Sequence, residues 1–260
     1  MPSVGSATVI THGRPELVAP AVQRVREVAE QAGVAIVDEG EPDLAVVLGG
    51  DGTMLRALTR FLGTNVPVLG VNFGRVGFLT AIAPDQLERD LERAFAGDYR
   101  VVELPTIEVA FDGETYVAVN DAVVTSGTIG RIVELAYAIG DEDLGVQRCD
   151  GLVCSTPQGS TAYNLSNGGP VVVWGLEAMV LTFVAPHSLH IRPLVVPRGP
   201  QVTITNRSSQ ITTQVIIDGH GVGSIAPGEL VLLRLGDQRS LLATMPEATF
   251  FSRYAAAFGR

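Results

Sequence analysis

Apolar and polar residues follow two different periods along the first 98 residues. Short β-branched apolar runs predict strands at residues 9–12, 34–37, 44–48 and 66–71. Apolar positions at helical spacing predict helices at residues 15–31, 53–61 and 84–95, and Gly33 ends the first of them. Pro20 favours a later start for that first helix. Because strands alternating with helices are typical of parallel βαβ units, we predict a small doubly wound α/β domain over residues 1–98.

The pattern changes to strands and turns from Tyr99 onward. Apolar and β-branched runs predict strands at residues 107–111, 116–124 and 132–139, several more up to residue 244, and a turn at Asp112-Gly113. We therefore predict a mostly-β second domain over residues 99–245. Residues 246–260 form a third segment, in which a terminal helix over 249–258 is expected to dock back on an apolar surface of the body. Its aromatic residues stand near helical spacing: Phe250, Phe251, Tyr254 and Phe258.

The composition is that of a globular protein, since 46% of the 260 residues are hydrophobic and 18% are charged. The formal net charge of −10 argues against nucleic acid or an anionic membrane as a partner, because both require a basic surface. The longest apolar runs, such as residues 178–185, are far shorter than the roughly 20 residues that span a bilayer. Residues 1–11 lack the basic start of a signal peptide. We therefore expect a cytoplasmic protein.

All 18 basic residues are arginine, because the chain contains no lysine. A Walker-type phosphate loop, a pyridoxal Schiff base and the active site of a protein kinase all require a lysine, so these chemistries are excluded. A bound phosphate must instead meet arginine, backbone N–H groups or a metal ion. We predict no metal site made of protein ligands alone and expect reduced thiols, because the cysteines and histidines lack metal-site spacing: Cys149, Cys154, His12, His187, His190 and His220.

The run of residues 44–48 leads directly into Gly49-Gly50-Asp51-Gly52-Thr53. A strand followed by such a turn delivers it to the carboxyl edge of a parallel sheet, where α/β proteins bind ligands. Glycines permit a sharp turn and close approach of the backbone, and the first N–H groups of the next helix face a bound phosphate. We predict a phosphate-binding turn made of Gly49, Gly50, Gly52 and Thr53, with Thr53 also capping the helix.

Asp51 is unusual in an anion-binding turn because it brings negative charge beside phosphate. It indicates a reactive hydroxyl group or a metal ion nearby, and we predict that Asp51 is the catalytic residue. The alternative is that Asp51 caps the helix and the glycines only turn the chain, although a cap does not require three glycines around it.

Three further segments carry polar or glycine-rich sequence. The loop over residues 70–79 contains Phe78, which is either a core residue or a stacking face for a nucleotide base and is counted here among the candidate nucleotide-binding residues. Residues 159–170 combine hydroxyl groups, a tyrosine and flanking glycines, which suits a polar ligand. Asn120-Asp121 lies inside an apolar run, and buried polar pairs without a partner are uncommon.

Together these segments resemble the NAD kinase family, from the first strand to Ile217-Asp218-Gly219. The Gly-Gly-Asp-Gly turn is shared with diacylglycerol and sphingosine kinases and, more loosely, with phosphofructokinases. The discriminating motifs are Asn120-Asp121 and residues 159–163 with their Gly168-Gly169-Pro170 ending. The resemblance implies a kinase that transfers the terminal phosphate of ATP, or of polyphosphate, to the adenosine ribose 2′-hydroxyl of NAD and so produces NADP. Asp51 would accept the proton.

The same resemblance implies a set of residues that contact the dinucleotide. Arg56, Arg131 and Arg148 have the alternative interpretation of solvated surface charges, and His220 stands where many family members carry glutamine. The set comprises Asp51, Gly52, Arg56, Asn120, Asp121, Arg131, Arg148, Asp150, Thr161, Ala162, Tyr163, Asn164, Leu165, Ser166, Ala185 and His220.

A divalent metal, Mg²⁺, is expected to be bound mainly through substrate phosphates, because few positive side chains are available and Mg²⁺ keeps waters and substrate oxygens as ligands. Family members are typically dimers or tetramers, so a homodimer or homotetramer is expected, with residues 187–193 near its interface. Two rival functions remain open: a lipid kinase, for which no basic amphipathic stretch is present, and a sensor that binds NAD or NADP without turnover. The sensor does not explain Asp51.

Overall fold

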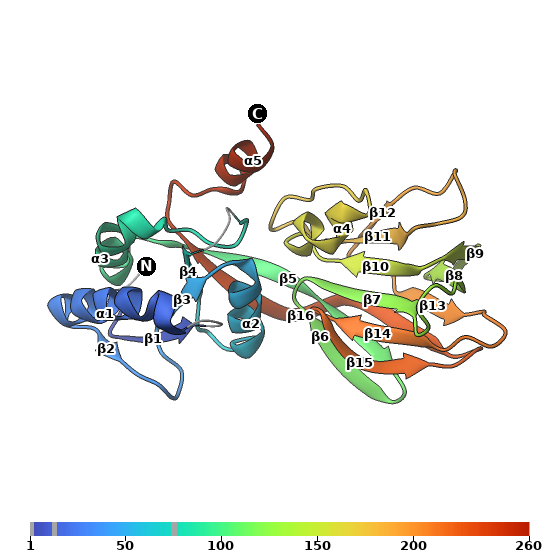
Figure 1. Cartoon of the computed structure of the whole chain (residues 1–260), viewed down its shortest axis with the longest axis horizontal. Coiled ribbons are helices and arrows are strands. Elements are labelled where there is room, and N and C mark those ends of the chain that lie inside the picture. Colours follow the sequence, from blue (N-terminus) through green and yellow to red (C-terminus); the bar gives the residue numbers. More distant parts are fainter. Residues whose placement is uncertain (1–2, 12–14, 74–76, 260) are drawn as a thin grey trace. The chain divides into compact units, whose positions relative to one another are not determined.

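The computed structural model describes residues 3–11, 15–73 and 77–259, and it divides into two compact units. The first unit comprises residues 1–104 and 239–260, and the second comprises residues 105–238. The chain passes from one unit to the other within two strands, β5 (Arg100–Phe111) and β16 (Leu230–Thr244) (Figure 1). His12 and the segment Gly74-Arg75-Val76 of the second glycine loop lie outside the described residues. No helix in the described part of the chain has the length and apolar character needed to span a bilayer.

The first unit is built on a parallel sheet in the order β2-β1-β3-β4-β16. Its apolar runs form strands because β-branched and aliphatic side chains pack well on a pleated sheet. The sheet and its helices confirm the predicted doubly wound α/β domain. The strands are β1 (Ser6–Thr11), β2 (Ala35–Ile36), β3 (Leu44–Gly49) and β4 (Val68–Asn72), and the helices are α1 (Pro15–Ala32), α2 (Asp51–Arg60), η1 (Pro84–Gln86), α3 (Leu87–Phe95) and α5 (Phe250–Phe258).

Strand β3 is buried on both faces. Leu44, Val46 and Leu48 belong to one core cluster with residues of α1 and α3. Ala45 and Val47 alternate with them, are also completely buried, and lie on the face that α2 contacts. An apolar run without polar alternation is therefore the sequence of a strand covered by helices on both sides.

Two details of the first unit differ from the sequence predictions. Helix α1 begins at Pro15, so Pro20 lies inside it and does not delay its start. Helix α2 begins at Asp51, with Gly50 as its N-cap and no side-chain cap hydrogen bond, so the prediction that Thr53 caps this helix was wrong. Thr53 is instead buried inside the first turn, where its backbone N–H donates to the carbonyl of Gly50.

Helix α5 docks by two of its four predicted aromatic side chains, Phe250 and Phe258, and by Arg253, which the sequence did not predict. The Phe250 and Phe258 rings lie 6.0 Å and 5.7 Å from the ring of Phe78, measured between centroids. Phe250 and Arg253 are its buried residues, whereas Phe251 and Tyr254 are exposed. The helix begins at an N-cap, Thr249, whose side chain accepts a hydrogen bond from the N–H of Ser252.

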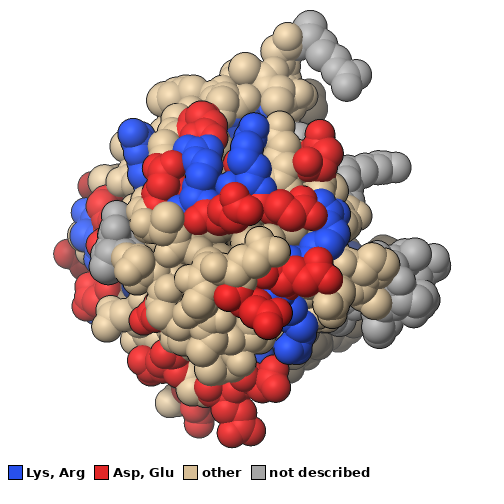
Figure 2. All heavy atoms as spheres, turned by 90° about the vertical axis from the view of Figure 1, so that its left-hand side faces the viewer, with Lys and Arg blue, Asp and Glu red and all other residues tan. Residues whose placement is uncertain are grey.

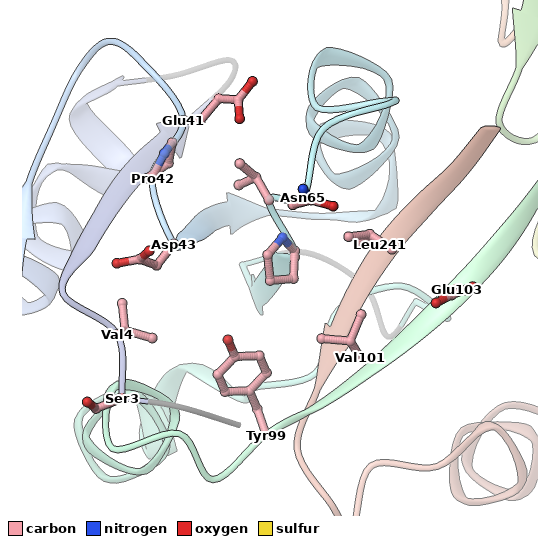
Figure 3. Close-up of a pocket in the computed structure, with 12 residues that line it drawn as sticks. Ser3, Val4, Glu41, Pro42, Asp43, Asn65, Tyr99, Val101, Glu103 and Leu241 are labelled. Atoms are coloured by element: carbon pink, nitrogen blue, oxygen red, sulfur yellow. The ribbon is translucent and has the colours of Figure 1, made fainter.

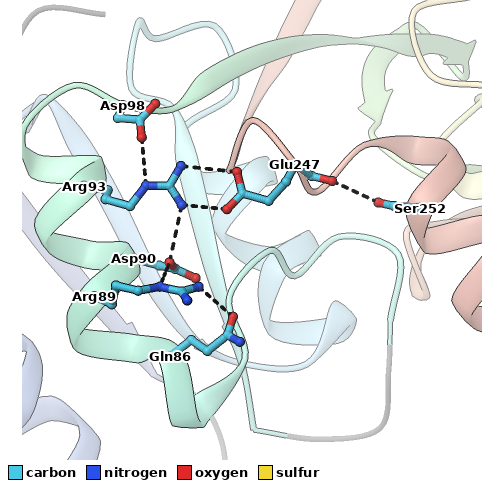
Figure 4. Close-up of polar contacts among 7 residues, drawn as sticks. All are labelled: Gln86, Arg89, Asp90, Arg93, Asp98, Glu247 and Ser252. Atoms are coloured by element: carbon cyan, nitrogen blue, oxygen red, sulfur yellow. Dashed lines mark hydrogen bonds and ion pairs between the residues drawn. The ribbon is translucent and has the colours of Figure 1, made fainter.

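A network of charged side chains connects α3 to the segment that precedes α5 (Figure 4). Arg93 contacts the carboxylates of Glu247, Asp98 and Asp90, and its shortest contact is 2.6 Å to Glu247. Because most of these groups are partly exposed, each pair contributes little on its own. Figure 2 shows the side of the molecule that lies at the left in Figure 1, where arginine and acidic side chains are also interleaved.

The second unit is a pair of packed antiparallel sheets, which confirms the mostly-β prediction. One sheet contains β16, β13, β8 and β9, with β5 and β6 alongside, and the other has the order β12-β11-β10-β7-β14-β15. One cluster of buried apolar side chains from both sheets forms its core. The strands are β6 (Glu114–Ala118), β7 (Asp121–Ser126), β8 (Val133–Ile139), β9 (Glu142–Cys149), β10 (Gly151–Ser155), β11 (Ala178–Val184), β12 (Leu194–Pro197), β13 (Val202–Asn206), β14 (Thr213–Ile217) and β15 (His220–Ile225).

The strand predicted over residues 116–124 is broken. β6 ends at Ala118 and β7 begins at Asp121, so Val119 and Asn120 lie between two strands of different sheets. The Asp112-Gly113 turn joins β5 to β6 as predicted, and both residues have positive φ, 51° and 78°. This is the combination that two-residue hairpin turns of type I′ require.

Thr249→Ala is expected to lower the free energy of unfolding by about 1 kcal/mol, because it removes the cap of α5. Denaturant unfolding of the purified variant measures this change. Thr249→Ser is the matched control, since serine retains the capping oxygen and is expected to stay close to the wild-type value. Equal losses in both variants would mean that the cap does not stabilise α5.

Candidate active site

The carboxylate of Asp51 is held in place by the backbone of a neighbouring loop. Its Oδ2 accepts a hydrogen bond from the N–H of Phe78 at 2.8 Å, and its Oδ1 accepts one from Leu79 at 3.0 Å. A Cβ on Gly77 would lie only 2.1 Å from Oδ1, so only glycine fits there. Because a carboxylate offers about four acceptor positions, two remain for other partners. The structure thus orients the carboxylate of Asp51 and leaves it able to accept a hydrogen bond or a proton from another group.

The glycines around Asp51 have two separate roles. A Cβ on Gly49 would lie 2.5 Å from the hydroxyl oxygen of Thr53, so Gly49 permits close packing of the strand end against the helix. A Cβ on Gly50 or Gly52 would meet nothing within 4 Å, so the backbone at these two residues is open to a ligand. In the first turn of α2 the N–H of Thr53 donates to the carbonyl of Gly50, whereas the start of a helix leaves the N–H groups of its first two residues, Asp51 and Gly52, for a ligand.

Two other predicted residues of the first unit lie nearby. Arg56 lies on the exposed side of α2, one turn after Gly52. Phe78 is buried, and its ring packs against Phe250 and Phe258. Of the two interpretations left open by the sequence, this placement is that of a core residue, and it is the backbone N–H of Phe78 that contacts Asp51.

In the second unit, the backbone at Asn120-Asp121 is bound on both sides. The carboxylate of Asp218 accepts hydrogen bonds from the N–H groups of Val119, Asn120 and Asp121 at 2.8, 2.7 and 3.2 Å. On the carbonyl side, the hydroxyl of Thr156 donates to the carbonyls of Val119 and Asn120 at 2.7 and 3.0 Å. These bonds satisfy the backbone groups that the break between β6 and β7 leaves without sheet partners.

Burial raises the pKa of two neighbouring carboxyl groups, those of Asp121 and Asp218. Asp121 is 7% exposed, and burial together with the nearby charge of Asp218 raises its pKa to about 7. Burial also raises the pKa of Asp218, although its three backbone hydrogen bonds act in the opposite direction. Because those bonds favour the carboxylate form, Asp218 is the member of the pair better suited to carry the charge.

Residues 159–170 form two short helices, η2 (Gly159–Thr161) and α4 (Tyr163–Ser166). A Cβ on Gly159 would lie 2.0 Å from the carbonyl oxygen of Asn120, so this glycine lets η2 approach the Asn120-Asp121 pair closely. Three sequence motifs that lie far apart along the chain are therefore brought together here: Asn120-Asp121, residues 159–164 and Ile217-Asp218-Gly219.

Asn164 is completely buried and supports α4 from inside. Its amide donates to the carbonyls of Ser160 and Pro170, and its oxygen accepts from the hydroxyl of Thr182 at 2.6 Å. A Cβ on Gly169 would lie 1.9 Å from that oxygen, which explains the Gly168-Gly169-Pro170 ending in physical terms. In contrast, Tyr163 is 44% exposed, Ala162 and Ser166 are exposed, and Thr161 and Leu165 are partly buried.

A second group of predicted residues lies elsewhere in the second unit. Ser155 pairs with Asp121 at one end of β10, and Gly151 pairs with Thr125 at the other, roughly 13 Å away along the strand. The second group gathers at that other end, is exposed and includes an alanine with φ of 45°: Arg131, Arg148, Asp150 and Ala185. His220 is exposed at the start of β15, and its Nδ1 lies 3.0 Å from the carbonyl oxygen of Asp218.

The sequence interpretation gave no role to several residues that organise these sites. Asp218 belongs to a motif that was recognised, but its contacts with Val119, Asn120 and Asp121 depend on a distant strand. Gln158 donates from its side chain to the carbonyls of Pro105 and Val119, and Thr156 stands beside it. The signal in the sequence was polarity beside an apolar run: Ser155 ends the buried strand β10, and Thr156 and Gln158 follow it.

A cavity of about 520 Å³ lies at the opposite edge of the parallel sheet (Figure 3). Its lining includes residues just before β1, β3 and β4, so it lies at the amino ends of these strands, away from Asp51. Figure 3 shows the ring of Tyr99 projecting into it near Val4 and Val101. Its charged lining residues are Glu41, Asp43 and Glu103, and none of its 12 lining residues is arginine, so it is poorly suited to phosphate.

A carboxylate fixed in a glycine turn, at the carboxyl edge of a parallel sheet and the start of a helix, is the geometry of a site for a phosphate-bearing ligand. Residues 12–99 match the family model of the ATP-NAD kinase N-terminal domain, and residues 119–244 match that of the C-terminal domain. The chain therefore belongs to the NAD kinase family. Both the fold and the family predicted from the sequence are confirmed.

Individual relatives agree with this assignment. An NAD kinase from Heliobacterium modesticaldum is 43% identical over 214 residues, which cover 80% of this chain and 76% of that protein. One from Gemmatimonas aurantiaca is 36% identical over 239 residues, covering 90% and 82%.

Two solved structures share the fold. The structure of an NAD kinase from Archaeoglobus fulgidus in complex with ATP has a TM-score of 0.80 and 25% identity, and the match covers 98% of this chain and 97% of that one. Yeast NADH kinase complexed with NADH has a TM-score of 0.87 at 20% identity, with coverage of 99% and 88%, which shows likeness of fold alone.

Asp121→Asn is expected to remove a pH-dependent part of the free energy of unfolding. The folded protein raises the pKa of Asp121 from about 4 to about 7, so the protonated form stabilises the fold. This contribution is fully present below about pH 4 and is lost as the pH rises through about 7. Denaturant unfolding across this range should show the wild type losing on the order of 1–4 kcal/mol relative to the variant.

Asp141→Asn serves as the control for this experiment, because Asp141 is an exposed carboxylate of the same unit. It should leave the pH dependence unchanged. Parallel curves for the wild type and Asp121→Asn would contradict a raised pKa at Asp121.

Proposed function

We propose that this protein transfers the terminal phosphate of ATP to the adenosine ribose 2′-hydroxyl of NAD and produces NADP. Membership of the NAD kinase family supports the reaction, and the geometry of Asp51 is the observation that carries it. A carboxylate that only capped α2 would accept hydrogen bonds from that helix, whereas Asp51 accepts them from the loop at Phe78 and Leu79. The capping alternative therefore does not describe this residue.

In the proposed reaction, the 2′-oxygen attacks the terminal phosphorus, the bond between that phosphorus and the bridging oxygen of ATP breaks, and ADP leaves. The proton of the 2′-hydroxyl passes to Asp51. A ribose hydroxyl is a poor nucleophile, so orienting it supplies much of the rate acceleration. The carboxylate of Asp51 has only to accept the proton late in the phosphoryl-transfer step. The phosphate-binding residues in this proposal are Gly49, Gly50, Gly52 and Thr53, with Gly50 and Gly52 offering open backbone.

The dinucleotide is proposed to bind through the second unit. Asn120 and Asp121 offer an amide and a carboxyl group on a segment that Asp218 and Thr156 hold fixed. Thr161, Ala162, Tyr163 and Ser166 offer exposed or partly exposed groups beside them. Asn164 is proposed to support these residues from beneath, since its amide groups already have protein partners.

The second group, comprising Arg131, Arg148, Asp150 and Ala185, is proposed to contact dinucleotide in a homodimer or homotetramer. Its separation from Asp121 along β10 supports this assignment, because the two groups of residues lie at opposite ends of that strand. A monomer with full activity would exclude it. The working compartment in this proposal is the cytoplasm.

A divalent metal, Mg²⁺, is proposed to bind mainly through the substrate phosphates. Within the described residues no group of three or more His, Cys, Asp or Glu side chains is placed to hold a metal ion. Both oxygens of Asp51 already accept backbone hydrogen bonds. This suits a carboxylate that accepts a proton from the substrate better than one that is a ligand in a metal site made of protein side chains. When bound, the metal would neutralise phosphate charge in a protein that has no lysine.

Removal of divalent metal with a chelator should abolish NADP formation.

Asp51→Asn is expected to lower kcat by on the order of 10²–10⁴-fold while NAD binding changes little, because the amide keeps the shape but cannot accept the proton. Steady-state kinetics measures kcat, and titration calorimetry measures the affinity for NAD. Asp38→Asn removes an exposed carboxylate of the same unit and should behave as the wild type. If affinity falls as far as kcat, Asp51 is a binding residue and not the base.

The function itself is tested by mixing the purified protein with NAD, Mg²⁺ and either ATP or polyphosphate. An NADP-specific dehydrogenase then reports the product. NADP formation with ATP supports the proposal, and formation with polyphosphate alone changes the donor. Binding of NAD without any NADP from either donor would mean that the protein is a sensor.

A further inference from the structure

Arg253 places a guanidinium group inside the first unit. It comes from α5, is 7% exposed, and donates through Nη1 to the carbonyl oxygens of Phe78, at 2.7 Å, and Thr80. Its Nη2 donates to the hydroxyl of Thr244 at 2.9 Å. Burial lowers the pKa of Arg253 to about 10, so the group remains charged at neutral pH. An interior charge that bonds the backbone so directly requires an explanation.

One peptide group connects Arg253 to Asp51. The carbonyl of Phe78 and the N–H of Leu79 belong to the same planar unit, and in a trans peptide they point in opposite directions. The carbonyl side accepts from Arg253, and the N–H side donates to Oδ1 of Asp51 at 3.0 Å. A rotation of this peptide would break both hydrogen bonds together, so the guanidinium fixes the donor that orients Asp51.

The loop and helix around this peptide are also held. Arg253 bonds the carbonyl at Thr80 as well as that at Phe78, so it restrains the loop on both sides of Leu79. Helix α5 is capped by Thr249, and the segment before it is tied to α3 through Glu247 and Arg93. Figure 4 shows the contact between Arg93 and Glu247, and the hydroxyl of Ser252 donating to the backbone carbonyl of Glu247.

We propose that Arg253 is a positioning residue for phosphoryl transfer, which sets the orientation of the Asp51 carboxylate through the peptide group between Phe78 and Leu79. This inference rests on the proposed function. Arg253 does not touch substrate in this assignment. A single arginine of the C-terminal helix, far from Asp51 in the sequence, thereby orients the carboxylate through the backbone.

The direct test replaces Arg253 by methionine, which keeps the aliphatic length and removes the donors. A misdirected carboxylate is expected to lower kcat by on the order of 10²-fold, with little change in the KM for NAD. Arg253→Lys keeps the charge but lacks the planar fork that bonds two carbonyls and a hydroxyl, so it should recover only part of kcat. If the wild type produces NADP and Arg253→Met has the same kcat, the proposal is overturned. A wild type without NADP formation would instead overturn the proposed function.

Thr249→Ala separates positioning from stability, because it weakens α5 without removing the guanidinium. It should lower the free energy of unfolding but leave kcat near the wild-type value. A second separation uses Asp51→Asn as the background. If Arg253 acts through Asp51, adding Arg253→Met to Asp51→Asn should change kcat far less than it does in the wild type. Independent, multiplying losses would show that Arg253 acts by another route.

Added guanidinium provides a test within a single variant, because kcat of the same folded protein is measured with and without the cation. A cavity of about 280 Å³ is lined by Arg253 together with Gly77, Thr80 and Ser252, so a small cation can reach the space left in Arg253→Ala. Millimolar guanidinium chloride should raise kcat of Arg253→Ala several-fold, whereas sodium chloride or urea at the same concentration should not. Failure of guanidinium to raise kcat in a folded Arg253→Ala variant would count against the positioning role.

Discussion

Hydrogen bonds from backbone N–H groups to aspartate carboxylates organise both units of this protein. Asp51 accepts two such bonds from the loop at Phe78 and Leu79, and Asp218 accepts three from residues 119–121. A third aspartate, Asp43, accepts two from Gly5 and Ser6 at the amino edge of the parallel sheet. Each of these segments is irregular or lies at the start of a strand, and its N–H groups would otherwise lose the partners that a strand or helix supplies. Charge-assisted bonds are about twice as strong as neutral ones, so one carboxylate can fix several residues.

The same interaction has different electrostatic results in different surroundings. At the exposed Asp43, the N–H groups of Ser6 and Gly5 lower the pKa of the carboxyl group. At Asp218, burial outweighs three such bonds and raises the pKa. The neighbouring Asp121 has no comparable set of backbone donors to oppose its burial, and its pKa rises to about 7. The second unit therefore places a carboxyl group whose pKa is raised to about 7 beside one whose burial is partly opposed by backbone hydrogen bonds.

Much of the fold could be predicted from the sequence because it depends on local periodicity. The run at Leu44–Leu48 has no polar alternation, which is the pattern of a strand buried on both faces, and the structure confirms it. The family was predicted correctly because its motifs are short and contiguous. The break at Val119 and Asn120 was missed because the apolar residues on both sides of Asn120-Asp121 form the pattern of one continuous strand. What ends the strand is Asp218, nearly 100 residues away, and no local pattern contains that contact.

The candidate site shows the same division between local and distant information. Asp51 is visible in the sequence because its glycine neighbours are unusual, but the cap of α2 was assigned to Thr53 because side-chain capping is common. The structure uses Gly50 and turns the carboxylate of Asp51 away from the helix toward another loop. Arg253 gives no sequence signal at all, since an arginine on an aromatic helix looks like its solvated face. Only the structure, in which Arg253 lies on the buried side of α5, distinguishes it from a solvated arginine.

Glycine has a larger role in these sites than a flexible turn would require. The glycines at 77, 159 and 169 are needed because a Cβ would overlap, respectively, the carboxylate of Asp51, the carbonyl of Asn120 and the amide of Asn164. In each case the backbone has come close enough to hold or support a polar group that the proposed reaction uses. Substituting these glycines would thus act on Asp51, Asn120 and α4 without removing any group that contacts a substrate. Glycine-rich motifs in this chain therefore record where polar side chains are packed against backbone, as well as where phosphate can approach.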